Sequence, residues 1–214
     1  MIRAVLFDMD GLLIDSERIY AQGVLAVAGG LGCAISEEML QEALGTTDAV
    51  TDAIFARGNP GYDGPALRRA LGDWLRQGGY DRRMPGKPYA GELLRRLTGR
   101  GVPCGLVTSS SRAAAENYLR QAGMFDLFSV VVTGDLGLPS KPAPDVYLHA
   151  AQQLGIPIGA CAVLEDSPNG LRAGRAAGAV TVMVPDLVPY TEALAPVCDH
   201  VVQNLMEAEA ILCR

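Results

Sequence analysis

Short apolar runs recur along the chain, and stretches with helical spacing separate them. The runs cover residues 3–7, 102–107, 129–133, 161–164 and 179–184. Because these runs are continuously apolar instead of alternating, they predict strands buried on both faces. Strands that alternate with helices are typical of a parallel sheet between helical layers, so we expect a three-layer, Rossmann-like α/β fold.

Two of the intervening stretches carry signals for both helix ends. Residues 144–154 begin at a proline and are followed by Gly155, the usual placement of these two residues in a helix. Residues 168–177 follow Ser167, a favoured N-cap residue, and precede Gly178.

The alternation is interrupted once, between the first and second runs. Residues 15–85 have helical periodicity only, and this length far exceeds the single helix that a crossover between parallel strands needs. We therefore expect an α/β core formed by residues 1–14 and 86–214, with an inserted helical subdomain at 15–85. The hinge candidates are Ile14–Ser16 and Met84–Gly86.

Composition and charge narrow the class of protein. The 214 residues are 49% hydrophobic and carry a formal charge of −6, which argues against a nucleic-acid polymer or an anionic membrane as the main partner. The longest charge-free run, 146–164, is interrupted by polar residues and falls short of the roughly 20 apolar residues of a spanning helix. The five scattered cysteines are typical of reduced thiols, so we expect a soluble, cytoplasmic protein without membrane association.

Acidic residues follow two of the predicted strands. Asp8 and Asp10 come directly after the first strand, and Gly11 allows the chain to turn there. Glu165 and Asp166 follow the fourth strand, where adjacent acids would repel each other unless a cation is present. Each pair could also be an ordinary acidic turn or a set of helix-start acids.

Hydroxyl groups and a lysine complete the set. Thr108 to Ser111 lie between the second strand and a helical stretch at 112–121, where hydroxyls either cap the helix or bind phosphate. The chain has only two lysines, Lys87 and Lys141, and Lys141 lies in a proline-rich loop. In parallel sheets the carboxyl ends of the strands share one edge, so these residues together predict a site for an anion and Mg²⁺.

The same residues resemble the four motifs of the haloacid dehalogenase (HAD) superfamily. Residues 8–17 (DMDGLLIDSE) look like motif one, while Thr108, Lys141 and the Glu165–Asp166 pair match motifs two, three and four in order. The helical insertion resembles the cap of the β-phosphoglucomutase-like subfamily. Within it, the start of the chain and residues 182–186 look most like the pseudouridine-5′-phosphatase group.

The resemblance implies a role for each acidic residue. Asp8 would be the nucleophile and a Mg²⁺ ligand, and Asp10 would be the general acid and base, with its backbone carbonyl on the metal. Asp166 would ligate Mg²⁺ with help from Glu165. The two acids of motif one can divide the chemistry because their environments differ.

The resemblance also implies how phosphate is bound and what the protein does. Thr108 and Ser109 would hold the transferring phosphoryl group, and Lys141 would stabilise both Asp8 and the phosphate. The implied activity is Mg²⁺-dependent hydrolysis of a small phosphorylated metabolite (a sugar, nucleoside or polyol phosphate) through an aspartyl-phosphate. We expect a monomer or a weak homodimer.

Two alternatives stay open beside the phosphatase. A β-phosphoglucomutase-type mutase normally has a histidine where this chain has Tyr20, and an arginine where it has Asp48. Arg76 could replace that arginine, although Arg68 and Arg69 suggest a solvated helix face there. A protein that only binds a phosphorylated metabolite is the remote alternative. Substrate choice is expected to depend on cap residues around 44–50 and 72–83.

Overall fold

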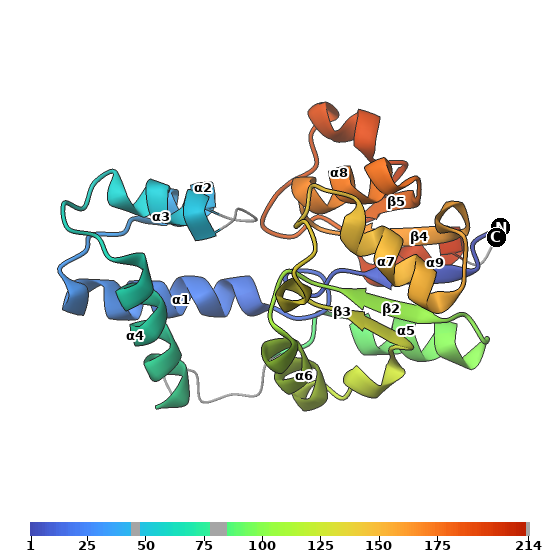
Figure 1. Cartoon of the computed structure of the whole chain (residues 1–214), viewed down its shortest axis with the longest axis horizontal. Helices are drawn as coiled ribbons and strands as arrows, with labels where there is room; N and C mark the ends of the chain where they lie inside the picture. The colour runs from blue at the N-terminus through green and yellow to red at the C-terminus, as the bar shows by residue number, and fades with distance from the viewer. Residues whose placement is uncertain (44–47, 78–84, 213–214) are drawn as a thin grey trace. The chain divides into compact units, whose positions relative to one another are not determined.

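The chain folds into two compact units. The computed structural model describes residues 1–43, 48–77 and 85–212. Unit 1 comprises Met1–Asp15 and Met84–Arg214, and unit 2 comprises Ser16–Arg83 (Figure 1). The boundaries expected from the sequence, 15 and 85, lie within two residues of this division.

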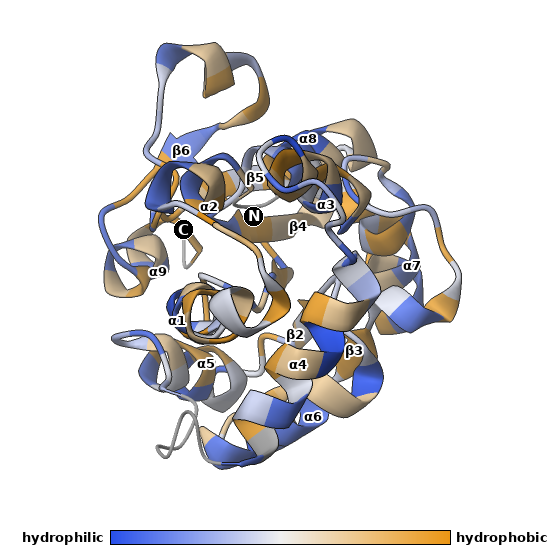
Figure 2. Ribbon diagram, turned by 90° about the vertical axis from the view of Figure 1, so that its left-hand side faces the viewer, coloured by the Kyte–Doolittle hydropathy of each residue, from blue (hydrophilic) through white to orange (hydrophobic). Residues whose placement is uncertain are grey.

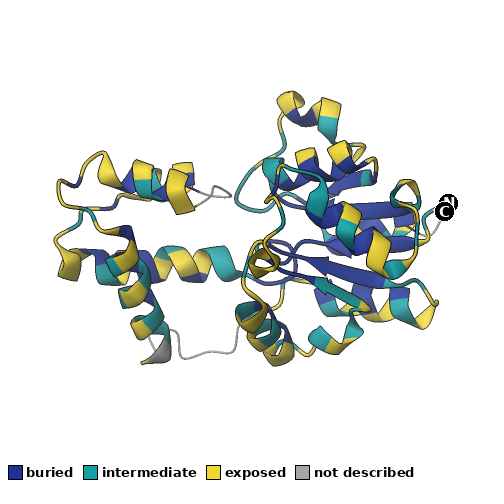
Figure 3. Cartoon of the chain, in the orientation of Figure 1, coloured by how far each residue is buried: buried dark blue, intermediate teal, exposed yellow. Residues whose placement is uncertain are grey.

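Unit 1 is built on one parallel sheet with the strand order β3-β2-β1-β4-β5-β6. The strands are β1 (Ala4–Phe7), β2 (Cys104–Val107), β3 (Val130–Val132), β4 (Cys161–Glu165), β5 (Val180–Met183) and β6 (His200–Val201). The Rossmann-like prediction is therefore confirmed, and β6 is a strand that the hydropathy pattern did not reveal. The strands β1, β2, β4 and β5 are mainly dark blue in Figure 3 because nearly all their residues are buried, as their continuous apolar runs require, whereas β3 is mostly half-buried and β6 is exposed.

Helices cover both faces of this sheet. They are α5 (Ala90–Gly99), α6 (Arg112–Gln121), α7 (Asp145–Leu154), α8 (Pro168–Ala177) and α9 (Leu205–Leu212). In Figure 1, α7 and α8 lie on one side of the strands and α5 and α6 on the other. The predicted ends of α8 are present, because Ser167 Oγ accepts a hydrogen bond from the Gly170 amide at 3.1 Å and Gly178 ends the helix with φ 90°.

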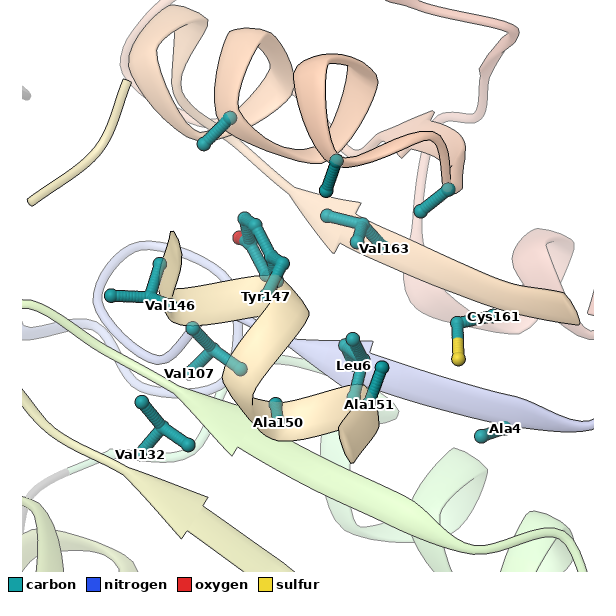
Figure 4. Packing of buried hydrophobic residues seen from close by; sticks show 13 residues of the cluster. Ala4, Leu6, Val107, Val132, Val146, Tyr147, Ala150, Ala151, Cys161 and Val163 are labelled. Atoms are coloured by element: carbon teal, nitrogen blue, oxygen red, sulfur yellow. The ribbon is translucent and has the colours of Figure 1, made fainter. Parts of the chain in front are cut away.

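The face of α7 packs on the middle of the sheet (Figure 4). Val146, Tyr147, Ala150 and Ala151 of α7 are buried in one cluster with side chains of β1, β2, β3 and β4. Tyr147 is the largest fully buried side chain of the described residues, and its hydroxyl is the one oxygen drawn in that cluster. A buried phenol needs a hydrogen-bond partner, and this partner is an acid of the site described below.

The chain passes between the units at one place in unit 1. Ile14 and Gly86 form an isolated antiparallel bridge. Beside it, Lys87 Nζ lies 2.6 Å from an Asp186 carboxylate oxygen and 3.6 Å from one of Asp15. These contacts tie the outgoing and returning segments to each other and to the loop after β5.

Unit 2 is helical in the residues that the structure describes. Its helices are α1 (Ser16–Ala28), α2 (Glu37–Ala43), α3 (Asp48–Ala56) and α4 (Gly64–Arg76), with a short 3-10 turn at Gly29–Leu31. Hydrophobic and hydrophilic residues alternate around α4 (Figure 2), and α1 packs closely on it. A Cβ at Gly23 would lie 2.2 Å from a Leu71 methyl, so a larger residue there would force that side chain to shift.

The expectation of a solvated arginine face on α4 is only partly correct. Arg68 donates to both carboxylate oxygens of Asp52, at 2.8 and 3.0 Å, and Tyr62 donates to the same acid at 2.8 Å. The side chain of Arg68 is thus engaged within unit 2.

Among the described residues, no helix is long and apolar enough to cross a membrane.

Candidate active site

The site lies where β1, β2 and β4 end side by side. Asp8 directly follows β1, and its amide still donates to the Leu164 carbonyl of β4 at 3.1 Å. Gly11 then adopts φ 79°, a conformation that favours glycine, and turns the chain away from the sheet. Asp8 is buried and Asp10 is partly buried, so the two predicted acids of this segment lie at the sheet edge in different surroundings.

Lys141 connects three strands through one ammonium group. Its Nζ donates to Asp8 Oδ1, to Glu165 Oε1 at 2.7 Å and to the Val107 carbonyl at 3.0 Å. These three acceptors use all three protons of the ammonium. Burial acts to lower the pKa of Lys141, but the carboxylates of Asp8 and Glu165 outweigh it and raise that pKa above its ordinary value. Lys141 therefore stays charged.

Glu165 is fully buried and surrounded by donors. Its Oε1 accepts from Lys141 and from the Tyr147 hydroxyl at 2.5 Å, and its Oε2 accepts from Ser167 Oγ at 2.9 Å. The backbone of Gly170 lies against the carboxylate so closely that a Cβ there would be 1.8 Å from the carboxyl carbon. Glu165 is thus fixed from several sides and acts as a counter-ion for Lys141.

Sequence reasoning did not find Tyr147. The signal was available, because this tyrosine lies on the apolar face of a predicted helix, where a phenol must find a polar partner. Burial, and secondarily the charge of Glu165, raise the pKa of the Tyr147 hydroxyl, so it remains a protonated donor.

Three buried acids of the site have the chemistry of a cation site. Ligand atoms of Asp8, Glu165 and Asp166 lie within 4.8 Å of one another. Carboxylate oxygens are the ligands that Mg²⁺ prefers. Burial raises the pKa of Asp8 well above its ordinary value; Lys141 opposes this shift, whereas Glu165 and Asp10 add to it. One lysine therefore does not balance the negative charge here, and the residues fit a divalent cation.

Glu165 already has hydrogen-bond donors at both carboxylate oxygens. Direct ligation of a cation by Glu165 would compete with these donors, Lys141 among them. Glu165 therefore holds Lys141 in the present arrangement and would have to give up part of these contacts to ligate a cation directly.

The hydroxyl loop after β2 lies against Asp10. Thr108 Oγ1 donates to Asp10 Oδ2 at 3.2 Å, and Ser110 Oγ donates to the same oxygen at 2.9 Å. Ser109, which the resemblance assigns to phosphate, is exposed, and Ser111 caps α6 by accepting from the Ala114 amide at 3.3 Å. The sequence marks a run of hydroxyls here but does not indicate which of them faces Asp10.

Some of the residues expected to choose the substrate lie outside the described residues. The structure does not describe residues 44–47 and 78–84. These include parts of both predicted specificity segments and Met84 of the predicted hinge. In unit 2, Asp48 lies 3.9 Å from Arg68, and the pKa of Tyr20 is raised by burial and by Asp48.

The fold and site together define an α/β enzyme whose acids and lysine meet at the strand ends. Residues 2–178 match the haloacid dehalogenase-like hydrolase family. The chain belongs to this family, and the prediction from the four motifs is confirmed.

Several members of the family are similar over most of the chain. Hexitol phosphatase B of Escherichia coli is 34% identical over 188 residues, covering 86% of this chain and 84% of the relative. The probable pseudouridine-5′-phosphatase of Drosophila melanogaster is 35% identical over 193 residues, covering 84% and 80%. The crystal structure of CbbY from Rhodobacter sphaeroides in complex with phosphate has a TM-score of 0.82 at 27% identity and covers 97% of this chain and 96% of its own.

Proposed function

We propose that this protein is a Mg²⁺-dependent phosphatase that hydrolyses a small phosphorylated metabolite through an aspartyl-phosphate on Asp8. One observation carries the proposal: Asp8 is a buried carboxylate held by the ammonium of Lys141 at the sheet edge. The oxygen of Asp8 that does not bind Lys141 can attack phosphorus. Relatives named as phosphatases, such as hexitol phosphatase B, support this reaction class.

In the first step, an Asp8 oxygen forms a bond to phosphorus while the bond from phosphorus to the substrate oxygen breaks. Asp10 gives its proton to the departing alkoxide, which leaves as the alcohol. Lys141 and the hydroxyls of Thr108 and Ser109 stabilise the charge on the phosphoryl oxygens, which accounts for much of the catalysis in phosphoryl transfer.

In the second step, water attacks phosphorus, Asp10 takes the proton, and the bond from Asp8 to phosphorus breaks. Asp8 is regenerated and inorganic phosphate leaves, so the net reaction consumes one water. When bound, Mg²⁺ would neutralise negative charge on the phosphoryl group. Asp8, Asp166 and the backbone carbonyl of Asp10 would hold it, with Glu165 assisting by fixing Lys141.

Charges in unit 2 favour the phosphatase over a mutase. Two acids, Asp48 and Asp52, lie near Arg68, and Asp52 binds both terminal nitrogens of its guanidinium. Arg68 is thus held by acids of its own unit, and Asp48 stands where the resemblance to mutases would require an arginine for the second phosphate, which supports a phosphatase.

The test is phosphate release from a panel of sugar, nucleoside and polyol phosphates, with Mg²⁺ and with EDTA, and it includes β-glucose 1-phosphate. We expect release that requires Mg²⁺ and is abolished in Asp8→Asn, while the circular dichroism spectrum of the variant is unchanged. Formation of glucose 6-phosphate without phosphate release would instead establish a mutase. Binding of a phosphometabolite without turnover would support the non-catalytic alternative.

A cytoplasmic location and a monomer or weak homodimer stay predictions. The four described cysteines, Cys33, Cys104, Cys161 and Cys198, are free thiols, which supports a reducing compartment. Light scattering coupled to size exclusion, over a range of protein concentrations, tests the oligomeric state.

A further inference from the structure

Three consecutive serines in the loop after β2 have three different surroundings. Ser109 is exposed, Ser111 is exposed and caps α6, and Ser110 is half-buried with its hydroxyl 2.9 Å from Asp10 Oδ2. The three residues have the same side chain, so their differences come only from the path of the loop.

The backbone of Ser110 is held on both sides. Its amide donates to Thr108 Oγ1 at 3.0 Å, and its carbonyl accepts from the Gly134 amide at 2.9 Å. Gly134 begins the short turn Gly134–Leu136 after β3. A Cβ on Gly134 would lie 2.1 Å from the Ser109 carbonyl oxygen, so only glycine lets this turn lie against the loop.

Asp135, which follows Gly134, adds hydrogen bonds that hold the same loop. Asp135 accepts from the Arg112 amide at 3.1 Å and from Thr133 Oγ1 at 2.6 Å. Hydrogen bonds from the Thr133 hydroxyl, and secondarily from the Arg112 amide, lower the pKa of Asp135. The end of β3 thus fixes the loop immediately before and at the start of α6, and this places the Ser110 hydroxyl on Asp10.

Thr108 and Ser110 cannot both keep donating a hydrogen bond to Asp10 during the proposed reaction. Each hydroxyl has one proton to donate. When a phosphoryl oxygen accepts the proton of Thr108, that hydroxyl can no longer donate to Asp10. The Ser110 hydroxyl can still donate to the Asp10 carboxyl, and its bond is the shorter of the two.

From this geometry we infer that Ser110 is a positioning residue for Asp10, which it keeps aimed while Thr108 binds the phosphoryl group. The inference rests on the proposed function, because it takes Asp10 as the acid and base. Ser110 itself need not touch the substrate. Its loss should therefore affect the steps in which Asp10 moves a proton and leave phosphate binding in place.

The experiment measures kcat/KM of wild type and Ser110→Ala with two substrates, the best alkyl phosphate from the panel and p-nitrophenyl phosphate. The value of kcat/KM reports phosphoryl transfer to Asp8. The value of kcat also includes hydrolysis of the aspartyl-phosphate, which needs Asp10 with either substrate. p-Nitrophenol leaves without much help from an acid. We expect Ser110→Ala to lower kcat/KM about 10- to 100-fold for the alkyl phosphate and less than about 3-fold for p-nitrophenyl phosphate.

Two further variants separate positioning from general damage to the loop. Ser111→Ala removes the neighbouring hydroxyl and the cap of α6, so it should lower the midpoint of urea denaturation without changing the ratio of the two kcat/KM values. Ser110→Thr keeps a hydroxyl, so its kcat/KM for the alkyl phosphate should be higher than that of Ser110→Ala. The ratio of the two kcat/KM values should then return toward that of wild type.

An equal loss on both substrates, or a rise in KM alone, would overturn the role of Ser110 as a positioning residue. The proposed function would survive either result, provided that wild type releases phosphate in a manner dependent on Mg²⁺ and Asp8. No release from wild type would overturn both proposals together.

Discussion

The two lysines of this chain occupy similar arrangements in different parts of unit 1. Lys141 lies between Asp8 and Glu165 at the ends of the strands. Lys87 lies between Asp15 and Asp186 beside the place where the chain leaves and re-enters the unit. Sixteen arginines serve elsewhere in the sequence, so a compact ammonium is present only where it bridges two acids.

The two arrangements differ in burial and in further partners. The Lys141 side chain is 7% exposed and that of Glu165 is 0% exposed, against 15% for Lys87 and 26% for Asp15. Lys141 also donates to the Val107 carbonyl and lies 5.2 Å from the centre of the Tyr147 ring. An ion pair between a lysine and two acids thus does not by itself indicate catalysis. The difference is that Lys141 orients an acid at the strand ends, whereas Lys87 fastens two chain segments.

Replacement of Lys141 should have the largest effect of all the variants, and the effect should be on activity. Lys141→Met removes the group that binds Asp8 and that we propose stabilises the phosphoryl oxygens, so we expect kcat/KM to fall by about 10² to 10³. Initial rates of phosphate release measure the loss. A decrease of less than about 10-fold would contradict the assignment of Lys141.

Metal binding should also distinguish the two sites. A ligand that binds only the folded state stabilises it, by about 2.7 kcal/mol at 100 times its Kd. We expect Mg²⁺ to raise the Tm of wild type, and of Lys87→Met, and to have little effect on Asp166→Asn. Thermal denaturation over a Mg²⁺ titration measures this without any substrate. An equal rise in Asp166→Asn would place the cation elsewhere.

A pair of glycine variants tests how tightly Glu165 is held. A Cβ at Gly170 would overlap the Glu165 carboxyl, whereas a Cβ at Gly99, also in a helix, meets no atom within 4 Å. We expect Gly170→Ala to cost about 1–3 kcal/mol of unfolding free energy and to reduce phosphate release through displacement of Lys141. Gly99→Ala should leave activity unchanged. Urea denaturation and initial rates would reveal an error if the two variants behaved alike.

Lys87→Met should have the smallest effect on chemistry. It leaves Asp186, whose side chain is 10% exposed, without its ammonium partner, so we expect a loss of about 1–3 kcal/mol in stability. The kcat/KM should change less than 10-fold, far less than in Lys141→Met. Lys87→Arg keeps the charge and should recover part of the stability, which urea denaturation can measure. A loss of activity equal to that of Lys141→Met would remove the distinction between the two lysines.

The sequence predicted the sheet well because its strands are buried on both faces and therefore continuously apolar. The five predicted strands are present, while β6 escaped notice because it has only two residues, both exposed. The acids and the lysine could be placed because parallel strands end at one edge. The partners of Tyr147, Ser110 and Arg68 could not be predicted, since each depends on a segment distant in the chain.

The bridge between Ile14 and Gly86 has a consequence for how such proteins diversify. The whole of unit 2 leaves and returns through two adjacent segments. Exchanging it for a segment of another length would therefore leave the ends of β1 and α5 where they are, and the entropy of closing a longer loop rises only slowly with its length. Evolution, or a protein engineer, could graft a different helical unit at this junction and keep the strand-end cluster intact.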